Sequence, residues 1–203
     1  MYRVTHQSAQ PQDQHPSDIT AVEQVRNGDT AAFEALVLRY SGMLFGLSYR
    51  MLGDREDAAD AVQEIFIRAF GALDSFDLSR PFHPWLYSIA VNHLRSVQRR
   101  RKRRPRPLSI DADRDNDGPP ITPGDATQDP QETALMRLAE RDAQRALDRL
   151  PRKYREVFVL RTVDELSVED VARILKVAPG TVKTRLHRAR RLLADALTKS
   201  ERI

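Results

Sequence analysis

The stretch LSVEDVARILKVAPGTVKTRLHRARRLL, residues 166–193, predicts two short helices joined by a tight turn. Ser167, followed three residues later by Asp170, is a variant of the capping box that begins a helix. Pro179 suits the first turn of a second helix, where its missing N–H would have no partner. Two helices with such a joint form a helix-turn-helix.

The second helix of this pair separates its side chains by character. At 100° per residue its apolar side chains fall on one stripe, formed by Val182, Leu186, Ala189 and Leu193. The opposite face carries Thr184, His187, Arg188 and Arg191. Such a helix fits the major groove of duplex DNA, where basic and hydroxyl side chains reach base edges and phosphates. A solvent-exposed basic helix on a small bundle would show the same periodicity. This stretch alone therefore does not distinguish a DNA-binding helix from a helix that only faces solvent.

The composition is that of a globular chain. Its 203 residues are 40% hydrophobic and 31% charged, which suffices for one domain or two small ones. There is no run of about 18 apolar residues and no N-terminal signal pattern, so we expect a cytoplasmic protein without membrane insertion. The absence of cysteine excludes disulfides, thiolate zinc sites and a cysteine nucleophile. The five histidines lack the spacing of ligands, so we expect no metal and no cofactor.

Helical periodicity predicts an all-α fold of two small domains. Four helices are expected in the first domain, over 19–27, 30–52, 55–73 and 82–100, and four in the second, over 132–150, 152–162, 167–175 and 179–198. The first domain then spans 18–104 and the second 132–198.

The remaining segments predict no packed structure. Residues 1–17 are rich in Gln, Pro, Ser and His, which predicts a disordered leader, and 199–203 form a short tail. Residues 105–131 hold six prolines, two glycines and six aspartates against two arginines, which predicts a flexible, acidic, Pro-rich linker.

The stretch GDREDAADAVQEIFIRAFGAL, residues 53–73, predicts a helix with an unusual outer face. Its buried face would carry Ala58, Val62, Ile65, Phe66, Ala69 and Leu73. The opposite face carries Asp60, Gln63, Glu64 and Ile67. An isoleucine exposed among acidic and amide groups favours a partner surface, although single exposed apolar residues are also common.

A second unusual face belongs to PWLYSIAVNHLRSVQRR, residues 84–100. Its buried stripe would be Leu86, Ala90, Leu94 and Val97, and its outer side Trp85, Ser88, Asn92, Arg95, Ser96 and Arg99. An aromatic ring beside cations and an amide suits single-stranded DNA, and Phe76 and Phe82 are candidates for the same pocket. The alternative is that Trp85 folds back over the edge of the domain.

The basic run RRRKRR, residues 99–104, follows directly. Such density attracts the phosphate backbone without reading its sequence, whereas the plain alternative is a solvated helix end.

Together these blocks resemble the extracytoplasmic-function, or group IV, sigma factors of bacterial RNA polymerase over about residues 18–198. DAADAVQEIFIRAF is similar to region 2.2 of that family, SFDLSRPFHPWLYSIAVNHLRS to regions 2.3 and 2.4, and LDRLPRKYREVFVLRTVDELSVEDVARILKVAPGTVKTRLHRAR to region 4. Three motifs in the family's order, separated by a linker, are far more specific than any one of them.

The resemblance implies a non-enzymatic subunit that directs core polymerase to specific promoters and promotes DNA melting. It implies docking on the β′ clamp helices through Asp60, Gln63, Glu64 and Ile67. It implies capture of a flipped base of the downstream promoter element by Arg68, Ala72, Phe76 and Asn92, beside Trp85, Arg95 and Arg99. Contacts to the upstream element are implied for Lys183, Thr184, His187, Arg188 and Arg191.

The implied partners are core polymerase, through β′ and β, promoter DNA and an anti-sigma factor, with the free protein a monomer. An ordinary helix-turn-helix repressor or activator is the alternative, but it leaves the outer faces of 53–73 and 84–100 unexplained. An enzyme is disfavoured because the chain shows no nucleophile, metal cluster or phosphate loop.

Two residues depart from the family pattern at the helix-turn-helix joint. Lys176 stands where the family commonly has glycine with a positive φ, and Ala178 stands where serine often caps the second helix. Each change is expected to cost roughly 1 kcal/mol.

Overall fold

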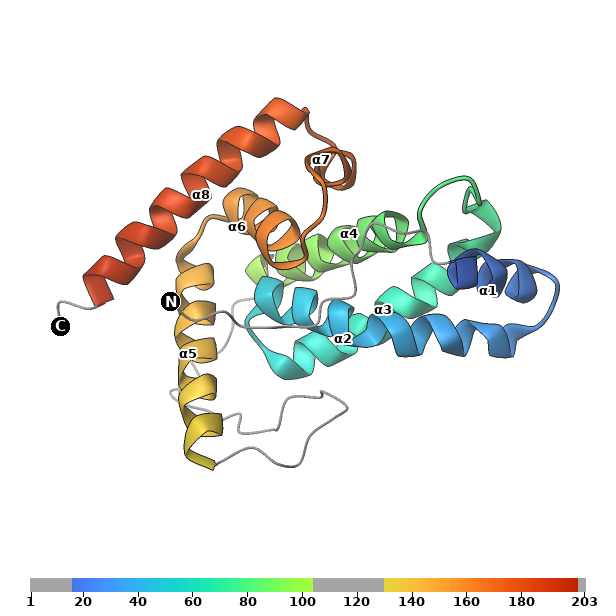
Figure 1. The fold of residues 1–203 in the computed structure, drawn as a ribbon, viewed down its shortest axis with the longest axis horizontal. Helices are drawn as coiled ribbons and strands as arrows, with labels where there is room; N and C mark the ends of the chain where they lie inside the picture. The colour runs from blue at the N-terminus through green and yellow to red at the C-terminus, as the bar shows by residue number, and fades with distance from the viewer. Residues whose placement is uncertain (1–15, 104–129, 201–203) are drawn as a thin grey trace.

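The computed structural model describes residues 16–103 and 130–200, and within these ranges it contains helices and no strand, so the predicted all-α class is confirmed. The N-terminal domain consists of α1 (Pro16–Arg26), α2 (Phe33–Leu52), α3 (Arg55–Ala72) and α4 (Phe82–Arg103), with short 3₁₀ turns at Thr30–Ala32 and Leu73–Ser75. The C-terminal domain consists of α5 (Pro130–Arg149), α6 (Arg152–Phe158), α7 (Val168–Leu175) and α8 (Pro179–Ser200), with a π-helical turn at Val159–Val163. Figure 1 shows both domains.

Each of the eight predicted helical stretches contains a helix, and the differences lie at the ends. The first helix begins at Pro16, inside the predicted leader, and α5 begins at Pro130, inside the predicted linker. The rest of the linker and residues 1–15 lie outside the described ranges. Within the described part of the chain, no helix combines the length and apolar content needed to cross a bilayer.

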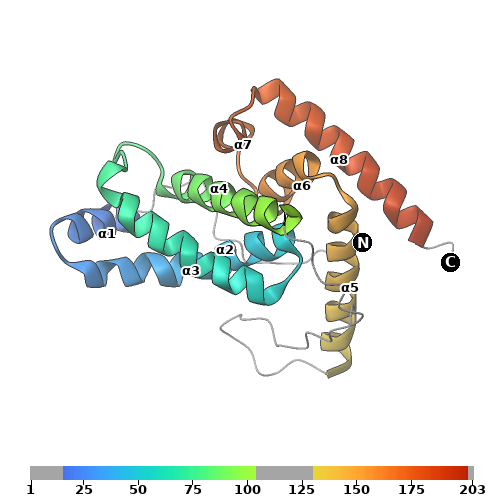
Figure 2. The same ribbon diagram turned by 180° about the vertical axis from the view of Figure 1, so that it is seen from behind.

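The core of the N-terminal domain lies among α2, α3 and α4. Its fully buried side chains occur at helical spacing on each helix and include Leu36, Leu44, Leu47, Ile65, Leu86 and Leu94. Gly53 ends α2 in the left-handed conformation, with φ 73°, and the Asp54 side chain then accepts a 2.9 Å hydrogen bond from the Asp57 amide to begin α3. These two adjacent signals turn the chain so that α2 and α3 pack side by side (Figure 2).

The first helix, α1, ties the loop before α4 to the domain. The Arg26 guanidinium donates to the carbonyl oxygens of Leu73 (3.0 Å) and Asp74 (3.2 Å), and also to that of Phe76. At the other end of α1, Asp18 accepts a 2.6 Å hydrogen bond from the Tyr40 hydroxyl of α2. The loop that precedes α4 is therefore held against α1.

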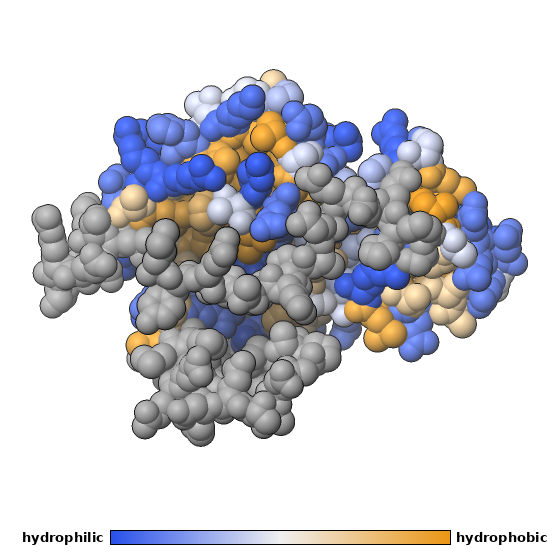
Figure 3. Space-filling view, in the orientation of Figure 1, coloured by the Kyte–Doolittle hydropathy of each residue, from blue (hydrophilic) through white to orange (hydrophobic). Residues whose placement is uncertain are grey.

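In the C-terminal domain, α6 and α7 pack against α8, and α7 and α8 form the predicted helix-turn-helix. Ser167 accepts from the Asp170 amide at 3.0 Å, which is the predicted cap of α7, and α8 begins at Pro179. Lys176 has φ 56° and ψ 51°, so the joint is left-handed although the residue is not glycine. The outer edge of α8 is largely hydrophilic, whereas apolar side chains gather between α8 and α6 (Figure 3).

The two domains touch along α4, with α7 packed against it and α5 beside the end of α2. Arg155 of α6 donates to the carbonyl of Met51 at 3.2 Å, and Gln144 of α5 donates to the carbonyl of Arg50 at 3.5 Å. The structure is therefore a closed arrangement in which the C-terminal domain covers part of α4.

Candidate functional site

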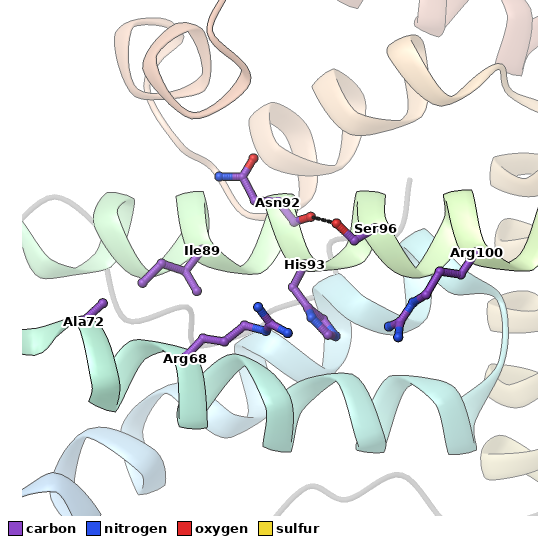
Figure 4. Close-up of a pocket in the computed structure, with 7 residues that line it drawn as sticks. All are labelled: Arg68, Ala72, Ile89, Asn92, His93, Ser96 and Arg100. Atoms are coloured by element: carbon purple, nitrogen blue, oxygen red, sulfur yellow. Dashed lines mark hydrogen bonds between the residues drawn. The ribbon is translucent and has the colours of Figure 1, made fainter.

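A pocket of about 570 Å³ opens between α3 and α4 on the surface of the N-terminal domain (Figure 4). Two of the side chains that line it come from α3 and five from α4: Arg68, Ala72, Ile89, Asn92, His93, Ser96 and Arg100. Three of the four residues expected to capture a flipped base, Arg68, Ala72 and Asn92, are thus brought together. Two guanidinium groups and an apolar wall are suitable contacts for a nucleotide, whereas the Asn92 amide is directed away from α3.

Phe76, the fourth residue of that set, lies elsewhere. It is 3% exposed, and its ring packs 4.9 Å from that of Trp85 and 5.5 Å from that of Phe82, measured between ring centroids. The rings of Trp85 and Phe82 are 5.3 Å apart, and Trp85 is half-buried. Trp85 therefore packs over the domain edge, and neither Trp85 nor Phe76 lines the pocket between α3 and α4.

The sequence prediction did not assign four lining residues, Ile89, His93, Ser96 and Arg100, to the pocket, although it placed Ser96 on the outer face of 84–100 and Arg100 in the basic run. Their positions do follow a helical stripe, with spacings of four, three and four residues, that faces α3. Helical spacing on 84–100 would have identified them if the position of α3 had been known. Asn92 and Ser96 are joined by a 3.0 Å hydrogen bond from the Ser96 hydroxyl to the Asn92 carbonyl.

His93 is the buried titratable group of this pocket. Its side chain is directed toward α3, and the residue is 6% exposed. Burial lowers the pKa of His93 from 6.5, and the positive charges of Arg68 and Arg100 lower it further, while Glu64 acts in the opposite direction. The imidazole is therefore neutral at pH 7.

The outer face of α3 presents the polar residues that the sequence placed there. Asp60, Gln63 and Glu64 are exposed, and Ile67 is 65% exposed. Phe70, one turn further along, is 43% exposed and adds a second apolar side chain that the prediction omitted. Two exposed apolar groups beside acidic and amide groups form a surface suited to a protein partner.

Arg95 is not free to contact DNA in the closed arrangement. Its guanidinium donates two hydrogen bonds, of 2.8 and 2.7 Å, to the carboxylate of Glu156 on α6. These hydrogen bonds raise the pKa of Arg95, and the Glu156 side chain is only 3% exposed. Arg99, one turn away, remains exposed.

The recognition helix α8 presents its predicted face to solvent. Val182 and Ala189 are fully buried and Leu186 and Leu193 are half-buried. The residues predicted to contact the upstream element are exposed: Lys183, Thr184, His187, Arg188 and Arg191. The Thr184 hydroxyl donates to the Gly180 carbonyl at 3.0 Å, so its side chain is directed back along the helix.

Two family models match the chain and follow the two domains. "Sigma-70 region 2" matches residues 36–104, and "Sigma-70, region 4" matches residues 140–193.

Several curated proteins are similar to nearly the whole chain. The ECF RNA polymerase sigma factor SigW of Bacillus subtilis is 38% identical over 178 residues, which is 87% of this chain and 94% of SigW. The ECF RNA polymerase sigma-E factor of Escherichia coli is 36% identical, covering 86% of this chain and 91% of its own. The RNA polymerase sigma-H factor of Pseudomonas aeruginosa is 34% identical, with coverage of 89% and 93%.

Two solved structures are similar to the fold. CnrH, solved in complex with the cytosolic domain of CnrY, has a TM-score of 0.63 and 28% identity and covers 90% of this chain and 98% of its own. The sigma factor RpoE of Bartonella quintana, solved with the anti-sigma factor NepR, has a TM-score of 0.61 and 27% identity, with coverage of 82% and 96%.

Proposed function

The chain belongs to the extracytoplasmic-function group of sigma-70 factors, and on that premise we propose how its surfaces divide the work of a sigma factor. Its function is to direct RNA polymerase to specific promoters and to promote the DNA melting that begins transcription. The polymerase catalyses RNA synthesis, and the sigma factor itself catalyses no reaction. We place the protein in the cytoplasm, where core polymerase and promoter DNA are found.

We assign docking on core polymerase to the outer face of α3. Three polar side chains there, Asp60, Gln63 and Glu64, surround the exposed Ile67. Burying Ile67 and its neighbour Phe70 against a partner removes apolar surface from water, while the polar groups at the rim determine which partner fits.

DNA is assigned to two separate surfaces. The pocket between α3 and α4 takes an unpaired nucleotide of the downstream element through Arg68, Ala72 and Asn92, and Arg95, Arg99 and the Trp85 edge lie along the path of that strand. The exposed face of α8 takes the upstream element in the major groove. The observation that carries this division is that one chain presents a pocket lined by guanidinium groups and apolar side chains on one domain and an exposed basic helix on the other.

An anti-sigma factor is the further partner that we propose. The structurally similar RpoE of Bartonella quintana was solved with the anti-sigma factor NepR bound, and CnrH was solved with the cytosolic domain of CnrY bound. A protein that covers α3 and α4 would compete with both polymerase and DNA.

Run-off transcription tests the function directly. The purified full-length chain, added to core polymerase and a library of genomic promoter fragments, is expected to produce promoter-specific transcripts. A helix-turn-helix repressor would instead protect DNA from cleavage without core polymerase and would yield no transcript.

The docking surface is tested by the double substitution Gln63→Ala and Glu64→Ala. Binding to core polymerase is expected to weaken by at least about tenfold, because interface residues at the centre of a patch contribute about 1–2 kcal/mol each. The matched control is Glu23→Ala with Gln24→Ala, an exposed pair of the same two residue types on α1. Equal binding by the two double variants would contradict the assignment to α3.

A further inference from the structure

His93 is a nearly buried imidazole without a hydrogen-bonding partner among the described residues. The residue is 6% exposed, yet it lines the open pocket between α3 and α4. The guanidinium groups of Arg68 and Arg100 approach its ring from either side (Figure 4). Three nitrogen-bearing side chains from two helices thus converge on one space.

The lining of the pocket changes from apolar to basic along its length. Ala72 and Ile89 lie toward one end, and Arg100 lies at the other, with Arg68 and His93 between them. The first end offers apolar contact to a flat base. The other end offers hydrogen-bond donors to an anion, chiefly the Arg100 guanidinium and the His93 ring, which donates from both nitrogens once it is protonated.

We propose that His93 and Arg100 form a phosphate-binding end of this pocket, which holds the phosphate of the same unpaired nucleotide whose base lies against Ala72 and Ile89. This inference rests on the proposed function of the pocket. It assigns a role to two residues that base capture by Arg68, Ala72 and Asn92 leaves unexplained. Both act by binding and positioning the strand.

Protonation gives the proposal a distinctive consequence. The charged groups that act on His93 are Arg68 and Glu64 from α3 and Arg100 from its own helix, and with the pocket empty burial and the arginines keep the ring neutral. A phosphate placed between the guanidinium groups offsets their charge and accepts hydrogen bonds from an imidazolium, which raises the pKa of His93. Binding therefore takes up a proton, and affinity increases as pH falls.

The experiment uses holoenzyme formed from the full-length chain and core polymerase. The probe is a fluorescent forked DNA whose unpaired strand carries the downstream element of a promoter found by run-off transcription. Lowering pH from 8 to 6 should strengthen wild-type binding, by up to about tenfold per pH unit for one proton. In His93→Gln this increase in affinity should be absent. The difference between the wild-type and His93→Gln pH dependences isolates His93, because all other titrating groups are common to both proteins.

Arg100→Ala provides a test that does not depend on a buried residue, because Arg100 is exposed. Loss of one phosphate contact on single-stranded DNA should weaken binding and reduce the slope of log affinity against log salt by about 0.7. Arg145→Ala, which changes an exposed arginine on α5, is the control and should leave both unchanged.

A single abasic nucleotide in the probe separates phosphate from base. On this probe the effects of His93→Gln and Arg100→Ala should persist, whereas the effect of Asn92→Ala should disappear. The proposal is overturned if His93→Gln retains the wild-type pH dependence, or if the effect of Arg100→Ala is lost on abasic DNA. Either result leaves the sigma function standing, since wild-type transcripts establish that function independently.

Discussion

Arg188 on α8 illustrates what a single exposed side chain contributes to promoter selection. It lies on the opposite side of the helix from Val182 and Ala189, whose complete burial fixes the rotation of α8 on its domain. The packing of Val182 and Ala189 therefore determines that the Arg188 side chain faces solvent. A guanidinium fixed in this way can donate two hydrogen bonds to a guanine in the major groove.

We predict that Arg188→Ala reduces affinity for the upstream element by roughly 1–3 kcal/mol. The loss should be confined to DNA carrying the correct element, because a base contact is made only there. Competition binding of holoenzyme with correct and scrambled upstream elements measures the difference. A uniform loss on both sequences would identify Arg188 as a phosphate contact instead.

At the scale of an element, the joint between α7 and α8 is strained. The Ser167 cap fixes the start of α7, and the chain must then turn sharply before Pro179 begins α8. Lys176 accomplishes this turn with φ 56°, a conformation that costs a residue with a Cβ about 1 kcal/mol. The burial of Val171, Ile174 and Val182 around the turn compensates for that cost.

We predict that Lys176→Gly stabilises the chain by about 0.5–1 kcal/mol, because glycine adopts a positive φ without steric penalty. Urea unfolding followed by circular dichroism measures the change. Arg190→Gly, at an exposed position inside α8, is the matched control and should destabilise by about 1 kcal/mol. Destabilisation by both substitutions would show that the backbone at residue 176 is not strained.

At the scale of the whole molecule, two ion pairs with buried carboxylates join the N-terminal and C-terminal domains. Glu156 binds Arg95 across the interface, and Arg50 of α2 lies 3.6 Å from Asp164, whose side chain is 7% exposed. Arg95 is among the residues assigned to promoter DNA. The closed arrangement and a DNA-bound arrangement therefore compete for the same guanidinium.

We predict that Glu156→Gln shifts the chain toward open arrangements, because Arg95 would remain half-buried without its counter-charge. Breaking a buried pair costs up to about 3–5 kcal/mol, and the partial exposure of Arg95 reduces this to about 1–3 kcal/mol. The sequence has no cysteine, so dyes on Glu34→Cys and Arg190→Cys can report the separation of the domains. Energy transfer should fall in Glu156→Gln and stay at the wild-type value in Glu140→Gln, an exposed substitution on α5. Unchanged transfer in both would mean that the ion pair does not hold the domains together.

We also predict that closure weakens as pH rises through 7. Burial raises the pKa of Asp164 to about 7, an effect that Arg50 partly opposes, whereas an exposed aspartate titrates near 4. The closed form therefore binds the extra proton. The resulting stabilisation is complete below about pH 4 and is lost progressively as pH rises to about 7, with about 1.4 kcal/mol of the loss falling between pH 6 and 8. The same pair of dyes should show more opening at pH 8 than at pH 6, and Asp164→Asn should lose that difference. A pH dependence of opposite sign in Asp164→Asn would identify His83, whose pKa burial lowers to about 4 in the closed form. A His83 that opening exposes would take up a proton near its usual pKa of about 6.5 and so would favour the open form at low pH.

Much of this molecule follows from local pattern. Helical spacing predicted the stretches in which the described ranges contain α1 to α8, and it predicted the exposed faces of α3 and α8, because a helix repeats every 3.6 residues whatever its surroundings are. Membership of the sigma-70 family followed from three such stretches in order.

The tertiary structure alone decided which of these faces meet. It placed Phe76 in a ring cluster and His93 and Arg100 in the pocket, because both outcomes depend on how closely α3 approaches α4. It also joined Arg95 to Glu156, 61 residues apart in the sequence. Local periodicity carries no information about such a pairing, since the distance between two helices is set by the packing of side chains that belong to both.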